Sequence, residues 1–76
     1  MAELPGVSGK SAIKAFKHLG FAHVRTEGSH HILKKDGHQF LLAVPVHGKQ
    51  QLKRGTLRGL IRASGHTVDE FVQALK

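Results

Sequence analysis

The chain has 76 residues, the length of one small domain, and it lacks cysteine, so neither disulfides nor thiolate metal sites can stabilise it. Its 12 Lys and Arg against 5 Asp and Glu give a formal charge of +7, which attracts phosphate backbones, acidic lipids or an acidic protein. Residues 1–5 carry neither the basic nor the apolar segment of an export signal, and no apolar run approaches the ~18 residues of a membrane span. We therefore expect one soluble domain, residues 1–76, in the cytoplasm.

Three helices are predicted from capping residues and apolar spacing. The first is capped by Ser8 and runs to about His18, with an apolar side at helical spacing. The second follows a cap at Thr56 and spans residues 57–64. The third opens with the capping box of residues 67–70.

Three strands are predicted between the first and second helices, at residues 21–26, 29–35 and 39–44. The dipeptide Asp36-Gly37 is typical of a two-residue type I′ loop, because that turn needs positive φ at both positions. We therefore expect an α+β fold in the order α-β-β-β-α-α, with the helices packed on one face of a three-stranded antiparallel sheet.

The predicted loop determines which of two neighbouring histidines faces outward. If the residues flanking the loop pair, Leu33 opposes Phe40 and His31 opposes Leu42 on the more apolar face of the sheet. The helices should cover that face. His31 is then directed toward the core and His30 toward solvent, because a strand alternates its side chains.

Gly28-Ser29-His30-His31 is the main candidate for chemistry. An imidazole with an unperturbed pKa near ~6.5 suits proton transfer at neutral pH, so His30 can act as general base or acid. Ser29 and the Gly28 backbone could hold a phosphate oxygen. His47, in the loop after the third strand, is a candidate proton donor or phosphate contact. The alternative is that these residues only build a turn, a strand and a loop.

No metal or other cofactor is expected, although the chain has 7 histidines. Adjacent histidines on a strand point to opposite faces and rarely chelate one ion, and no cysteine completes a ligand set. The carboxylates, including Glu27 and Glu70, are expected to lie away from the histidines, which excludes a two-metal site. Residues 6–11 superficially resemble a P-loop, but the glycine spacing is wrong and no strand precedes them.

Basic residues are candidate contacts to a nucleic acid backbone. Lys10, Lys14 and Lys17 recur at helical spacing and share one stripe, and no acidic residue occurs between residues 37 and 68. A solvated helix face and a surface charged for solubility are the alternatives. No Trp or Tyr is available for base stacking. The candidate RNA contacts are Gly28, Lys10, Lys14, Lys17, Lys34, Lys49, Lys53, Arg54 and Arg58.

Short motifs over nearly the full length carry a family resemblance. They are Leu4-Pro5-Gly6-Val7-Ser8-Gly9-Lys10, Leu19-Gly20-Phe21, Gly28-Ser29-His30, Val44-Pro45-Val46-His47, Leu52-Lys53-Arg54-Gly55-Thr56-Leu57, Ala63-Ser64-Gly65 after Ile61, and Glu70-Phe71. With this ordered set, the chain resembles the HicA (YcfA-like) family of bacterial mRNA-cleaving toxins.

The resemblance implies a fold similar to a double-stranded RNA-binding domain. It also implies an endoribonuclease that needs no metal, and a HicB antitoxin that covers the active histidine. The family's catalytic histidine lies in the Gly-Ser-His motif and maps to His30. Some members carry it one place later, which is His31 here.

The resulting hypothesis is RNA cleavage by attack of a 2′-hydroxyl on the adjacent phosphorus, with His30 removing the hydroxyl proton. Lys34 and residues 49–58 would hold the backbone and stabilise the developing charge. Candidate supporting residues are Ser29, His31 and His47. The rival hypothesis is a double-stranded RNA-binding module that uses the same basic surface without catalysis.

Overall fold

The elements follow the predicted order of one helix, three strands and two helices. The structure is a computed structural model, and it describes residues 4–76. The expectation about an export signal falls partly on residues 1–3, which lie outside that range. Within residues 4–76, no helix is both long and apolar enough to cross a membrane.

Helix α1, Gly9–His18, begins where a side chain replaces the missing backbone partners of the first turn. The Ser8 hydroxyl accepts a hydrogen bond from the Ser11 backbone N–H at 3.2 Å. The helix ends at Leu19, and Gly20 follows with φ of 102°, a conformation that favours glycine. The first predicted helix is confirmed.

The sheet contains β1 (Ala22–Glu27), β2 (His30–Lys34) and β3 (Leu42–Pro45), antiparallel and in that spatial order. Gly28 and Ser29 alone connect β1 to β2. Gly28 has φ of 61°, whereas Ser29 does not have positive φ. This pattern fits a type II′ turn, which requires glycine at its first central position.

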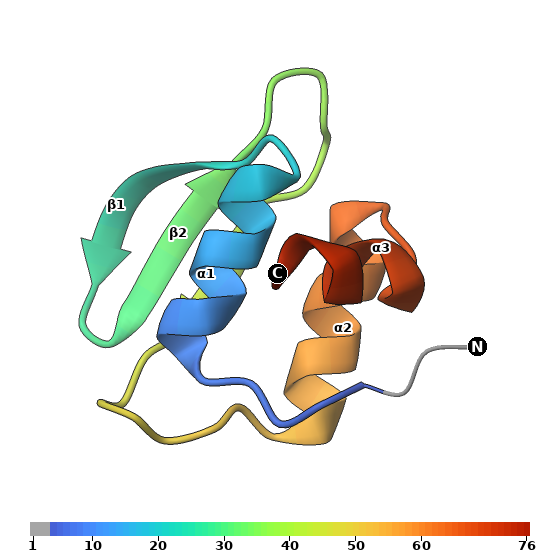
Figure 1. Cartoon of the computed structure of the whole chain (residues 1–76). Helices are drawn as coiled ribbons and strands as arrows, with labels where there is room; N and C mark the ends of the chain where they lie inside the picture. The colour runs from blue at the N-terminus through green and yellow to red at the C-terminus, as the bar shows by residue number, and fades with distance from the viewer. Residues whose placement is uncertain (1–3) are drawn as a thin grey trace.

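The two-residue loop predicted between the second and third strands is wrong. The His38 N–H donates to the Lys35 carbonyl at 3.0 Å, so a turn forms, but only Gly37 has positive φ (78°). A type I′ turn needs positive φ at both central residues. The chain therefore continues as a loop over residues 35–41, the green segment at the top of Figure 1.

This longer loop moves the pairing of β2 with β3 by two residues from the prediction. Leu33 faces Leu42 and His31 faces Val44. Because the shift is even, each side chain keeps its predicted face. However, Phe40 was predicted to lie in the core opposite Leu33, and this is wrong, since it lies in the loop and is 57% exposed.

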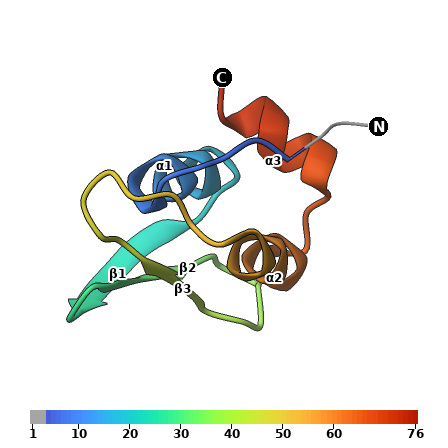
Figure 2. The ribbon, with the colours of Figure 1, turned by 90° about the horizontal axis from the view of Figure 1, so that it is seen from below.

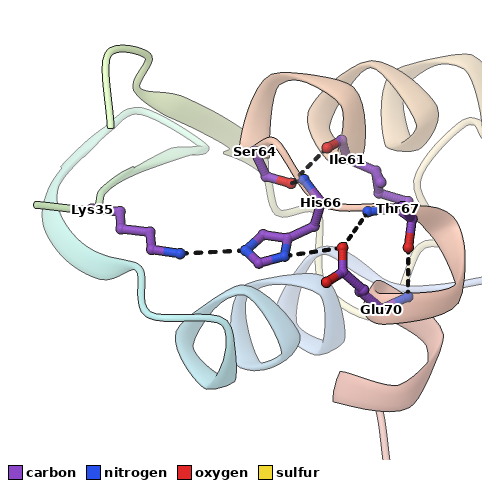
Figure 3. Close-up of polar contacts among 6 residues, drawn as sticks. All are labelled: Lys35, Ile61, Ser64, His66, Thr67 and Glu70. Atoms are coloured by element: carbon purple, nitrogen blue, oxygen red, sulfur yellow. Dashed lines mark hydrogen bonds and ion pairs between the residues drawn. The ribbon is translucent and has the colours of Figure 1, made fainter. Parts of the chain in front are cut away.

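Polar contacts tie this loop to residues 63–70. The His38 Nε2–H donates to the Ala63 carbonyl at 2.6 Å. The Lys35 ammonium lies 3.3 Å from His66 Nε2, and His66 Nδ1 lies 3.4 Å from Glu70 Oε1 (Figure 3). These contacts compete with extension of the two strands toward a tight turn.

Helix α2, Arg54–Ser64, begins three residues before the predicted start. The prediction that Thr56 caps it is wrong, because Lys53 occupies the N-cap position and makes no side-chain cap hydrogen bond. Instead, the Lys53 carbonyl accepts from the Leu57 N–H at 3.0 Å, which places Thr56 inside the first turn. The helix ends at Gly65, with φ of 81°.

Helix α3, Val68–Ala74, has the predicted capping box. The Thr67 hydroxyl accepts from the Glu70 N–H at 3.1 Å, and Glu70 Oε1 accepts from the Thr67 N–H at 2.8 Å. The hydrogen bond from the Thr67 backbone lowers the pKa of the Glu70 carboxyl, and His66 lowers it further.

The three helices form two layers on one face of the sheet. Figure 2 shows α1 and α2 above the sheet, with α3 beyond them. The Phe16 ring of α1 lies 5.0 Å from that of Phe71 in α3 and 6.0 Å from that of Phe21. These rings join the inner side chains of the sheet in a core that includes Leu33, Leu42, Val44 and Leu57. The predicted α+β fold is therefore confirmed.

Candidate functional site

His30 stands at the end of the tight turn and on the face of the sheet away from the helices. It pairs with Glu27 of β1 and with Pro45 of β3, and it is exposed. Within residues 4–76, its side chain makes no hydrogen bond, ion pair or ring contact. The predicted outward direction of His30 is confirmed, and its ring is free to meet a ligand.

A carboxylate lies opposite this histidine, contrary to the expectation from sequence. Side chains of directly paired strand residues have Cβ atoms about 4.5–5.5 Å apart, so Glu27 is an immediate neighbour of His30. Glu27 is also ion-paired with Arg25. Glu70 likewise lies beside a histidine, His66. The sequence signal for the pair Glu27 and His30 is the turn at residues 28–29, because the residues that flank a two-residue turn pair with each other.

His47 is brought to the same end of the sheet as the tight turn. The Val46 N–H donates to the Ser29 carbonyl at 2.8 Å, and His47 follows directly. The His47 carbonyl then accepts from the Gln50 N–H at 3.0 Å. The exposed imidazole of His47 lines a hollow of about 250 Å³. The other residues lining it are Pro45, Gln50, Gln51, Leu52, Lys53 and Thr56.

His31 faces the opposite side of the sheet from His30, toward helix α1, and is half-buried. Its ring lies 5.3 Å from that of His23, centre to centre, with the two planes inclined by 53°. Both rings line a groove of about 520 Å³ between the helix and the hairpin. The other residues lining it are Lys10, Ile13, Lys14 and Lys17.

The structure separates the remaining predicted RNA contacts. Lys34 shares the outer face with His30, but four residues along a strand place it about 13 Å away. Lys49 lies in the loop after β3, and Lys53 and Arg54 lie at the start of helix α2. Arg58 lines a different hollow of about 250 Å³, with Arg62 and His66 among its neighbours. The basic residues therefore form several patches rather than one continuous surface.

Comparison with known proteins gives one family. A family model described as the HicA toxin of bacterial toxin-antitoxin matches residues 9–66, which is more than half of the chain. The match includes the tight turn, both histidines at the start of β2, and the groove. No curated protein matches the chain.

Proposed function

The chain belongs to the HicA toxin family of bacterial toxin-antitoxin systems, and we propose that it is a metal-independent endoribonuclease that cleaves mRNA in the cytoplasm. His30 is the general base. The observation that carries this proposal is an exposed imidazole without an internal partner, held at a tight turn in a protein of charge +7. Such a group can meet an RNA strand and take a proton from it.

The reaction begins when His30 removes the proton of a ribose 2′-hydroxyl. The 2′-oxygen then attacks the adjacent phosphorus, and the bond from phosphorus to the 5′-oxygen of the next nucleotide breaks. The departing 5′-oxygen takes a proton from a general acid, for which His47 is the candidate at the same end of the sheet. The products are a 2′,3′-cyclic phosphate and a 5′-hydroxyl, so no water is consumed in this step.

The surroundings favour His30 over His31 as the base. A base must reach the hydroxyl within hydrogen-bonding distance, and His30 is exposed at the surface. By contrast, His31 is half-buried and its ring is against His23. Glu27 is the residue opposite His30 on the neighbouring strand.

Groups around the turn supply the rest of the site. The Ser29 hydroxyl and the backbone of Gly28 lie next to the base and can contact a phosphate oxygen. Lys49, Lys53 and Arg54 hold the RNA backbone from the loop after β3 and from the start of α2. A HicB-like antitoxin would then neutralise the toxin by covering His30. One positioned proton-transfer group contributes about 10²–10⁴-fold in rate, which is sufficient for a slow toxin.

The test measures cleavage of an RNA oligonucleotide by purified protein in the presence of a chelator. We expect fragments that end in 2′,3′-cyclic phosphate from the parent and, at saturating RNA, also from His31→Ala, because His31 is not the base. We expect a loss of about 10²–10⁴-fold in rate for His30→Ala. Circular dichroism and thermal unfolding establish that each variant is folded.

Growth arrest after expression in bacteria should follow the same order as cleavage in the test tube. A folded His30→Ala protein that cleaves at the parental rate would remove His30 from the mechanism. RNA binding by the parent without any cleavage would instead support the non-catalytic RNA-binding module.

A further inference from the structure

A β-bulge in the edge strand β1 changes which of its side chains face helix α1. His23 pairs with Leu33, and Thr26 pairs with His31. On β1 the two residues are three positions apart, whereas their partners on β2 are only two positions apart. The extra residue is Val24, where the register shifts. In a regular strand, residues three apart face opposite sides. Here the bulge turns both His23 and Thr26 toward helix α1.

The bulge therefore assembles two imidazoles and a hydroxyl. His23 Nε2 lies 2.8 Å from the Thr26 hydroxyl, which holds the His23 ring in place. The ring centre of His31 is 5.3 Å from that of His23. None of these three side chains is part of the apolar core.

Three ammonium groups form the facing wall of the groove. Lys10, Lys14 and Lys17 follow one another at i, i+4 and i+7 on α1, so they share one stripe. Ile13 supplies an apolar surface between them and is 9% exposed. Among residues 4–76, no carboxylate lines the groove. Its volume, about 520 Å³, lies within the range of small-molecule sites.

These features fit one nucleotide of a single RNA strand. A phosphate is attracted to the ammonium groups and to a protonated imidazole. A base or ribose can lie on Ile13 and on the outer faces of the two rings. A base cannot lie between the rings, because that requires about 7 Å, twice a van der Waals contact, and the rings are 5.3 Å apart.

We propose that the groove between α1 and the β1–β2 hairpin is an RNA subsite, separate from His30, that holds one nucleotide by its phosphate. Lys10, Lys14 and Lys17 contact the phosphate from the helix, and His23 and His31 contact it from the strands. The choice of RNA as the ligand rests on the proposed function. His30 lies on the opposite face of the sheet, so the subsite anchors the strand away from the scissile bond.

Binding in the groove depends on pH as a consequence of the two imidazoles. A phosphate is bound more tightly by protonated than by neutral histidine, so affinity increases as the pH falls from 8 to 6. The charged groups facing the imidazoles are the three lysines of α1.

The test uses a 2′-O-methyl RNA oligonucleotide, which lacks the nucleophilic hydroxyl and therefore stays intact. Its affinity is measured by fluorescence anisotropy over a range of salt concentrations and at pH 6 and 8. Lys14→Gln should weaken binding and reduce the salt slope by about 0.7, the contribution of one phosphate contact on a single strand. Lys76→Gln removes the same charge outside the groove and should leave the slope unchanged.

The double variant His23→Gln/His31→Gln should lose most of the difference in affinity between pH 6 and 8. Unchanged binding in both Lys14→Gln and the histidine variant would overturn the proposal, and Lys14 is exposed, so its variant is expected to fold. The outcome is separable from the cleavage test. Weaker binding by groove variants of a protein that never cleaves RNA supports the groove and rejects the nuclease, whereas His30-dependent cleavage with unchanged binding does the reverse.

Discussion

The two ends of the sheet are connected in different ways. At one end, residues 28–29 form a tight turn and leave His30 exposed. At the other end, the loop of residues 35–41 is held by His38 and His66, which contact Ala63, Lys35 and Glu70. His38 and His66 thus have internal partners that hold the loop, whereas His30 has none within residues 4–76 and remains available for a ligand. The difference also shows that a glycine-containing dipeptide closes a tight hairpin only where no tertiary contact competes.

The largest expected effect on the free energy of unfolding tests whether residues 35–41 form a loop rather than extended strands. Leu42 is fully buried, so Leu42→Ala should lower the free energy of unfolding by about 2–5 kcal/mol. Phe40 is mostly exposed, and Phe40→Ala should change it by less than about 0.5 kcal/mol. Urea denaturation measures both. An equal loss for the two variants would mean that the strands extend toward a tight turn, as they do at the other end.

A smaller effect compares the turn glycines. Gly28 and Gly37 both have positive φ, and an added Cβ meets no atom within 4 Å at either position, so the cost of alanine is conformational. Gly28→Ala should cost about 1–3 kcal/mol, because the paired strands prevent relaxation. Gly37→Ala should cost less, because its loop can adjust. The midpoints of thermal unfolding measure both variants. A lower midpoint for Gly37→Ala than for Gly28→Ala would contradict this expectation.

The smallest effect is the pH dependence of the contacts at the loop end. The Thr67 backbone N–H lowers the pKa of Glu70 in the folded state, so the carboxylate stabilises the protein above the unfolded pKa. This contribution is lost as the pH falls through the lower folded pKa. In urea titrations between pH 6 and pH 3, the parent should lose more stability than Glu70→Gln. The same pH dependence in both proteins would show that the Glu70 carboxylate contributes nothing.

Part of the site followed from the sequence and part did not. The alternation of side chains in β2 correctly separated His30 from His31, and it did so despite a register that was two residues wrong. The pairing of Glu27 with His30 was missed because the first strand was expected to end at Thr26, which left Glu27 outside the strand. The position of His23 depended on a bulge that leaves no distinct signal around Val24.

The sequence by itself determined the order of the elements, the caps at Ser8 and Thr67, and the direction of each histidine on β2. These features depend on contacts within a few residues, or on the period of two in a strand. Only the tertiary structure decided the start of β3, the exposure of Phe40 and the groove beneath α1. Those features arise from contacts between distant segments, such as His38 with Ala63, whose energies compete with local turn preferences.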